Sequence, residues 1–142
     1  ITVTEGESFG GNLFSVSASD DQRFRLFNDP DSLVAVAVIT GTVPSYAAGL
    51  GCVAETSVSR LGIAELIEFR NWSAGDAWEV AGGRVATIND SEWESDLASG
   101  FQIRSNDGNA QVRVSWSPIN DEDPSQDGWL HSIDYLALTY HR

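Results

Sequence analysis

Two tryptophans near a predicted turn are the residues of this sequence best suited to bind a ligand. Trp72 precedes a Gly75–Asp76 turn signal, and Trp78 follows it. An exposed indole ring offers an apolar face on which a sugar ring can stack, and neighbouring carboxylates can accept hydrogen bonds from sugar hydroxyls. The predicted ligand-binding residues are therefore Trp72, Trp78, Asp76 and Glu79. The other tryptophans, Trp93, Trp116 and Trp129, fall on apolar positions of alternating segments and are expected to pack in the core.

A single carboxylate interrupts the long apolar segment from Gly128 to Tyr140. An ionised carboxylate inside a core strand is costly unless it is paired or bound to a metal. Asp134 is therefore expected to bind either an arginine or a calcium ion. The arginines considered as partners are Arg23, Arg25 and Arg113.

The same terminal segment changes its apolar phase at Asp134. Trp129, His131 and Ile133 share one parity, whereas Leu136, Leu138 and Tyr140 share the other. Either this strand is buried on both faces, or a β-bulge resets its register at Asp134–Tyr135.

No catalytic constellation is recognisable in the chain. Its carboxylates show no spacing that singles out the pair a glycosidase needs, and it has no G-x-S-x-G motif. His131 and His141 lack a Cys or Asp partner at metal-ligand spacing. Cys52, the one cysteine, lies in an apolar context and is expected to be a buried small residue. The protein is therefore predicted not to be an enzyme.

The charge balance excludes several partners. The 142 residues include 21 acidic residues and 8 basic ones, all arginine, for a net charge of −13. Nucleic acids and anionic membrane surfaces are bound by clustered Lys and Arg, and no apolar run reaches the ~20 residues that span a bilayer. We therefore expect no nucleic-acid partner and no membrane insertion. Strong acidity is compatible with divalent cations and with neutral ligands such as sugars.

Apolar and polar residues alternate with a period of two, which is typical of β-strands with one buried face. The clearest segment is 110–116, whose apolar face is Ala110, Val112, Val114 and Trp116. Segments 24–26 and 67–70 repeat the pattern. Segment 33–39 is apolar at nearly every position, as expected of a central strand covered on both faces.

Turn residues separate these segments at short intervals. Asp107–Gly108 is the strongest local signal, and Gly82–Gly83 is a further predicted turn. About eight or nine strands with this spacing predict an all-β fold, a two-sheet antiparallel β-sandwich with jelly-roll topology. We expect a single domain, 1–142, in which 1–12 form a loosely ordered N-terminal lead-in.

An ordered set of short motifs resembles a known domain. The motifs are SASDDQRFRL at 17–26, IEFRNW at 67–72, AWEV at 77–80, RVAT at 84–87, QVRVSW at 111–116 and SID at 132–134. Together they resemble an uncharacterised extracellular β-sandwich domain that recurs in large secreted and surface proteins of planctomycete-type bacteria. That domain is similar in outline to galactose-binding-like jelly rolls and carbohydrate-binding modules. The acidic segment 120–127 departs from its pattern.

The resemblance implies an extracellular or cell-surface location and a calcium site. In galactose-binding-like sandwiches, the segment before an early strand lies beside the last strand, and several carbohydrate modules hold a structural calcium ion there. The residues at these positions are Asp20, Asp21 and Asp134. Two or three carboxylates plus loop carbonyls suffice for this ion, which takes six to eight oxygen ligands. In the alternative, Asp20 and Asp21 only cap a turn and Asp134 pairs with an arginine.

Two functions remain open. The first is a non-catalytic extracellular module that binds a polysaccharide or other glycan. The second is a structural or assembly module of a bacterial surface protein or filament, which needs no small-molecule ligand and would self-associate. Retention by a polysaccharide favours the first function, and self-association favours the second.

Overall fold

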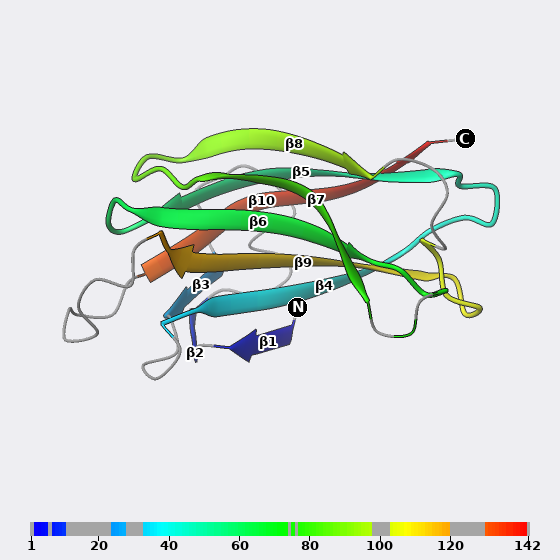
Figure 1. Ribbon diagram of the computed structural model, residues 1–142, viewed down its shortest axis with the longest axis horizontal. Helices are drawn as coiled ribbons and strands as arrows, with labels where there is room; N and C mark the ends of the chain where they lie inside the picture. Colours follow the sequence, from blue (N-terminus) through cyan, green and yellow to red (C-terminus); the bar gives the residue numbers. More distant parts are fainter. Residues whose placement is uncertain are drawn as a thin grey trace.

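Within its described residues the chain forms ten strands in two antiparallel sheets of five strands each (Figure 1). The computed structural model describes residues 2–5, 7–10, 24–27, 33–73, 75, 77–97, 103–119 and 130–141. The strands are β1 (Thr2–Glu5), β2 (Glu7–Gly10), β3 (Phe24–Phe27), β4 (Ala35–Thr42), β5 (Gly49–Val58), β6 (Ile63–Arg70), β7 (Trp78–Val85), β8 (Ser91–Leu97), β9 (Asn109–Pro118) and β10 (Leu130–His141). In this part of the chain there is no helix that could cross a membrane.

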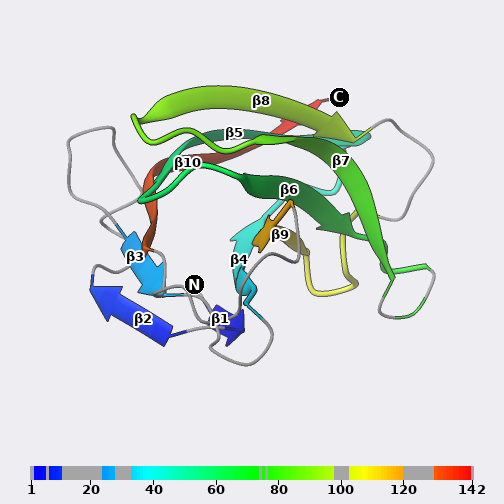
Figure 2. The ribbon, with the colours of Figure 1, turned by 60° about the vertical axis from the view of Figure 1, so that its left-hand side comes forward.

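The two sheets form a sandwich (Figure 2). Sheet A has the strand order β1-β4-β9-β6-β7, and sheet B has the order β2-β3-β10-β5-β8. The chain crosses from one sheet to the other at every step except β2 to β3 and β6 to β7. Repeated crossing of this kind is typical of a jelly roll. The predicted all-β, two-sheet antiparallel sandwich with jelly-roll topology is therefore confirmed.

The alternating segments bury the faces that the sequence indicates. On β9, Ala110, Val112, Val114 and Trp116 are all fully buried. Gln111 and Arg113, between them, point to the other side of sheet A and are half-buried. Ile67 and Phe69 of β6 lie in the same core. The predicted register of β9 is therefore confirmed.

A β-bulge resets the register of β10 where its apolar phase changes. Ile133 lies opposite Thr56 and Tyr135 lies opposite Glu55, so that Asp134 is the extra residue between two consecutive partners on β5. Both apolar sets therefore face the core: Ile133 is fully buried, and Leu136 and Leu138 pack against the core. Of the two alternatives left open by the sequence, the bulge is the one observed.

Residues 2–5 and 7–10, within the expected lead-in, form β1 and β2, which pair with β4 and β3. One predicted turn differs from the structure. The predicted turn at Gly82–Gly83 is wrong, because both glycines lie inside β7, where they pair with Ile67 and Leu66. The glycine signal reflects close packing: a Cβ on Gly82 would lie 3.0 Å from Ser95 Oγ.

Candidate functional site

Sheet A carries a set of polar and aromatic side chains on the face that points away from the core, hereafter the outer face of sheet A. It comprises Thr40 of β4, Gln111 and Arg113 of β9, Glu68 and Arg70 of β6, and Trp78 of β7. In the sheet register, Thr40 lies opposite Gln111, Glu68 opposite Arg113, and Arg70 opposite Trp78. The alternation that buries Val112 and Phe69 therefore brings four strands' polar residues onto one surface.

Each of the two predicted ligand-binding tryptophans lies against an arginine of this face. The Arg113 guanidinium carbon is 4.5 Å from the centre of the Trp78 ring, and that of Arg70 is 4.2 Å from the centre of the Trp72 ring. Glu68 holds Arg113 in place through two hydrogen bonds of 2.8 and 2.9 Å, donated by Nε and Nη2. Such two-pronged pairs fix the plane of the guanidinium, and the stacked indole is fixed with it.

A chain of hydrogen bonds crosses the same face. Arg70 Nη1 donates to Gln111 Oε1 at 2.9 Å, and Gln111 Nε2 donates to Thr40 Oγ1 at 3.2 Å. Because Thr40 Oγ1 accepts a hydrogen bond from Gln111, the hydroxyl proton of Thr40 points away from Gln111. The face thus offers ordered donors and acceptors beside two indole rings.

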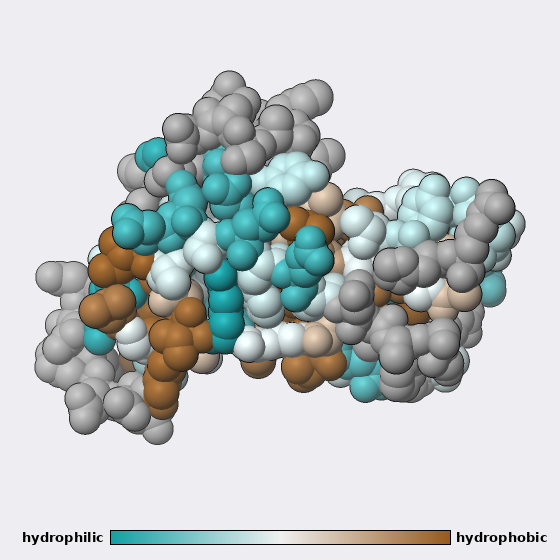
Figure 3. Space-filling view, turned by 90° about the horizontal axis from the view of Figure 1, so that it is seen from above, coloured by the Kyte–Doolittle hydropathy of each residue, from teal (hydrophilic) through white to brown (hydrophobic). Residues whose placement is uncertain are grey.

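An apolar stripe adjoins these polar residues on β6 and β7. Leu66, Val80 and Val85 are 37, 61 and 58% exposed. Viewed from above, hydrophobic side chains gather towards the end of the molecule that carries the β5–β6 turn, and hydrophilic ones lie beside them (Figure 3). The outer face of sheet A therefore combines apolar and hydrogen-bonding surface.

The turn that carries Trp72 is held by its own side chains. Asn71 Oδ1 accepts hydrogen bonds from Ser73 N at 3.1 Å and from Ser73 Oγ at 2.7 Å, and Asn71 N donates to Ala77 O at 3.0 Å. Gly75 has a φ of 68°, which favours glycine. The position of Trp72 beside Arg70 is thus fixed locally.

The structure brings together two of the four predicted ligand-binding residues. Trp72 and Trp78 both lie beside Arg70. Glu79 lies opposite Phe69, on the parity that faces the core, and its Oε1 accepts a 3.3 Å hydrogen bond from Asn71 Nδ2. Asp76 lies outside the described residues. The sequence analysis did not include Arg70 and Arg113 among the ligand-binding residues, although both occupy outward positions of the alternating segments 67–70 and 110–116.

A separate acidic group lies beside the bulge of β10. Glu55, Asp90 and Asp134 offer carboxylate oxygens that all lie within 4.8 Å of one another. Asp134 is only 2% exposed. A donor set made of carboxylate oxygens fits calcium, a hard cation. Asp20 and Asp21, the other predicted metal ligands, lie outside the described residues, and Arg113, a proposed partner of Asp134, binds Glu68 instead.

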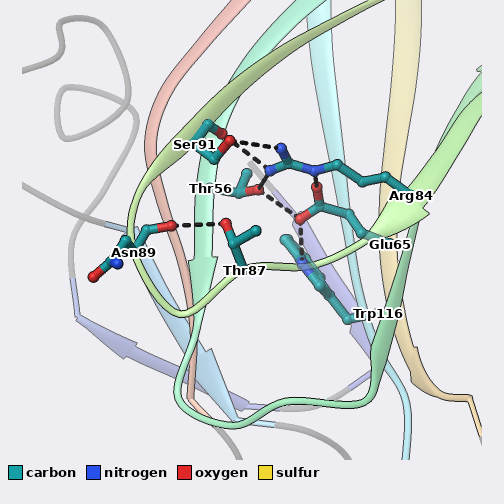
Figure 4. Close-up of polar contacts among 7 residues, drawn as sticks. All are labelled: Thr56, Glu65, Arg84, Thr87, Asn89, Ser91 and Trp116. Carbon is teal, nitrogen blue, oxygen red and sulfur yellow. Dashed lines mark hydrogen bonds and ion pairs between the residues drawn. The ribbon is translucent and has the colours of Figure 1, made fainter.

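A buried polar network lies between the sheets near the β7–β8 edge (Figure 4). Glu65 is fully buried; it accepts hydrogen bonds from Trp116 Nε1 and Thr56 Oγ1, both at 2.6 Å, and pairs with Arg84 Nε at 2.9 Å. Arg84 also donates to the Ser91 carbonyl at 3.0 Å. These side chains satisfy one another and join β5, β6, β7, β8 and β9, which makes the network structural.

Cys52 has no nucleophilic character in this environment. It is buried, as predicted. Burial, with a contribution from the charge of Glu65, raises the pKa of its thiol to about 12. A thiol with this pKa stays protonated at neutral pH.

Comparisons with known proteins identify the fold. No family model and no curated protein matches the sequence. A family 61 carbohydrate-binding module, solved in complex with β-1,4-galactotriose, matches with a TM-score of 0.57 at 12% identity, over 99% of this chain and 88% of that chain. The fold is that of a carbohydrate-binding module. A family 4 module matches with a TM-score of 0.58 at 10% identity, over 98% of this chain and 94% of that one. The resemblance to carbohydrate-binding modules is confirmed at the level of the fold.

Proposed function

We propose that this chain is a non-catalytic, extracellular carbohydrate-binding domain whose ligand lies on the outer face of sheet A. The observation that carries the proposal is the pair of arginine-stacked tryptophans, Trp72 and Trp78, beside the hydrogen-bonded row from Arg70 to Thr40. The resemblance to a domain of secreted and surface proteins supports the extracellular location.

The chemistry of the face suits a sugar. Pyranose rings carry apolar C–H faces, which stack on indole rings and aliphatic side chains. Their hydroxyls, at the ring edges, hydrogen-bond to charged and amide groups such as Arg113 and Gln111. Because Glu68 and Arg113 already hold Trp78 in place, and Arg70 lies on Trp72, little side-chain entropy is lost when a glycan binds.

Electrostatics favours a neutral glycan on this face. The outer face of sheet B carries Glu55, Glu92 and Glu94 in one row of neighbouring positions. On the outer face of sheet A, the described carboxylate Glu68 is neutralised by Arg113. Among the described residues, this face therefore presents paired charges beside the tryptophans, which suits an uncharged ligand.

The test is retention by polysaccharides in affinity electrophoresis, with β-1,4-galactan, xylan and mixed-linkage β-glucan as probes. Trp78→Ala and Trp72→Ala are each expected to weaken binding by about 1–3 kcal/mol, by analogy with stacking on aromatic side chains elsewhere. Tyr135→Ala, which removes an aromatic ring from the outer face of sheet B, is the matched control and should bind as the wild type does. Absence of retention by every polysaccharide, or full retention by both tryptophan variants, would contradict the proposal.

We further propose that Glu55, Asp90 and Asp134 bind a calcium ion that stabilises the fold. Their carboxylate oxygens all lie within 4.8 Å of one another, close enough for one calcium ion to bind all three residues. Millimolar CaCl2 should then raise the melting temperature, because a ligand of the native state stabilises it by mass action. Asp134→Asn should abolish the shift, and Asp107→Asn, on an exposed turn, should retain it. An unchanged melting temperature in the wild type would leave Asp134 with a side-chain partner instead.

The assembly function stays a second proposal because of one observation. Exposed apolar residues lie on the β5–β6 connection, on the β7–β8 connection and just after β9: Leu61 is 69%, Ile88 52% and Ile119 50% exposed. Exposed apolar patches often mark contacts between proteins. Sedimentation velocity over a concentration series distinguishes the two functions, since an assembly module should form larger species that Leu61→Asp disrupts.

A further inference from the structure

Two exposed tyrosines form a pair at one end of the sandwich. Tyr46 lies in the turn between β4 and β5, and Tyr140 lies near the end of β10 (Figure 1). They are 51 and 44% exposed, with ring centres 5.9 Å apart and planes at 65°. Their hydroxyl oxygens are 3.4 Å apart, and this contact raises the pKa of Tyr140 above its ordinary value. The two aromatic rings thus pack edge to face and stay exposed to solvent.

Both rings are carried by rigid backbone. The turn before Tyr46 is held by Val43, which is 1% exposed, whose N–H donates to Gly108 O at 2.9 Å and whose carbonyl accepts from Arg104 Nε at 2.8 Å. The turn itself is closed by a hydrogen bond of 3.1 Å from Ala47 N to Pro44 O. Tyr140 lies in the β10–β5 ladder opposite the fully buried Leu50. A ligand would therefore find the rings already ordered, which reduces the entropy lost on binding.

We propose that Tyr46 and Tyr140 form a second glycan contact, separate from the outer face of sheet A. This inference rests on the proposed glycan-binding function. A sugar ring can stack on one tyrosine face while its hydroxyls meet the adjacent phenol groups, which both donate and accept. The pair is carried by β10 and the β4–β5 turn, whereas the tryptophans are carried by β7 and the β6–β7 turn.

The charge of the chain decides between a glycan and the other possible occupants. A second copy of the chain would bring another net charge of −13 against the first. A basic peptide would meet Arg104, whose guanidinium lies on the Val43 carbonyl in the same turn region. A neutral glycan meets neither penalty. Two contacts on one domain then act together on a long polysaccharide, because the second contact is made at high effective concentration.

The experiment compares long and short glycans. The best-retained polysaccharide of the panel and the trisaccharide of the same sugar are titrated calorimetrically against the wild type and the Tyr46→Ala/Tyr140→Ala double variant. We expect the double variant to lose about tenfold or more in affinity for the polysaccharide, since avidity is lost, and to bind the trisaccharide at the tryptophan face as the wild type does. The Tyr46→Phe/Tyr140→Phe variant keeps both rings and should retain most of the polysaccharide affinity.

The outcomes separate this inference from the proposed function. Unchanged polysaccharide affinity in the alanine double variant overturns the second contact but leaves the tryptophan face intact. An equal loss for trisaccharide and polysaccharide overturns it too, since the tyrosines would then belong to the first site. A wild-type protein that binds neither probe overturns the proposed function itself. Circular dichroism and the melting temperature establish that each variant is folded.

Discussion

Glu65 and His131 lie in the same core beside Trp116, but Glu65 is in an ion pair whereas His131 is neutral. Trp116 donates its Nε1 proton to Glu65 and stacks on His131, with ring centres 5.1 Å apart. Glu65 forms an ion pair with Arg84. Burial lowers the pKa of His131 to about 3, so this imidazole stays neutral. Both groups are tolerated because neither leaves an unmatched charge in the interior.

The low pKa of His131 predicts a loss of stability in mild acid. Below its ordinary pKa of about 6.5 the unfolded chain binds a proton on this residue, whereas the folded protein does so only near pH 3. His131 therefore does not lower the free energy of unfolding above about pH 6.5. Between about pH 6.5 and pH 3, that free energy falls by roughly 1.4 kcal/mol for each pH unit of acidification. His131→Phe keeps a ring on Trp116 but cannot titrate. Urea denaturation between about pH 7 and pH 5 should show a shallower pH dependence in this variant; equal slopes would contradict the assignment.

For single residues, the sequence predicted which side chains are buried better than which side chains contact one another. The burial of Cys52 follows from its apolar neighbours, and that of His131 follows from local alternation. The stacking of Trp78 on Arg113 does not, because the two residues lie on strands that are not adjacent in the chain, and only the sheet register brings them together. Glu79 was assigned to the tryptophan side, although neighbouring strand residues point to opposite faces.

In strand β10, the one extra residue Asp134 resets which side chains face the core. Removing Asp134 should leave both apolar sets facing the core, because the bulge residue alone is lost. Removing Ala137 should turn Leu138 and Tyr140 towards solvent. We expect the second deletion to be less stable than the first by about 2 kcal/mol or more, the value of burying one leucine. Urea denaturation of both proteins in EDTA measures this; a more damaging Asp134 deletion would contradict the bulge.

Two adjacent glycines of β7 provide a matched pair of substitutions. A Cβ on Gly82 would lie 3.0 Å from Ser95 Oγ and 3.1 Å from Trp93 Cζ3, both held in the packed region between the sheets. A Cβ on Gly83 would meet only Leu66 Cδ2 closely, at the end of a flexible, partly exposed side chain. Gly82→Ala should therefore cost about 1–3 kcal/mol from overpacking, and Gly83→Ala about 0.5 kcal/mol or less. Thermal denaturation of both variants measures the two losses of stability. A larger loss in Gly83→Ala than in Gly82→Ala would contradict this prediction.

Strands and the bulge were predictable because they depend on local periodicity. The Gly82–Gly83 turn was mispredicted, because glycine pairs signal tight turns and close strand packing alike. Similarly, the assignment of β1 to sheet A and β2 to sheet B depends on pairing with distant strands, which short-range patterns do not contain.

At the scale of the whole molecule, the high acidic charge affects stability, and among the described residues several carboxylates lie together on the outer face of sheet B. Glu92 and Glu94 of β8 are exposed, and Glu55 lies opposite Glu92 on the neighbouring strand. A net charge of −13 should destabilise the compact state by self-repulsion. Raising NaCl from about 0.01 to 0.15 M shortens the screening length from about 30 to 8 Å and should raise the melting temperature in EDTA. The affinity for a neutral glycan should not change over the same range. A melting temperature that falls with salt would contradict this.

The acidic edge strand β8 also bears on aggregation. An edge strand exposes unpaired backbone groups to which a strand of another molecule can add. An identical β8 approaching this edge would set Glu92 and Glu94 against their own copies, and like charges across a strand pair are destabilising. Copies of this domain crowded at high local concentration should therefore resist edge-to-edge fusion through β8, without any residue reserved for that purpose alone.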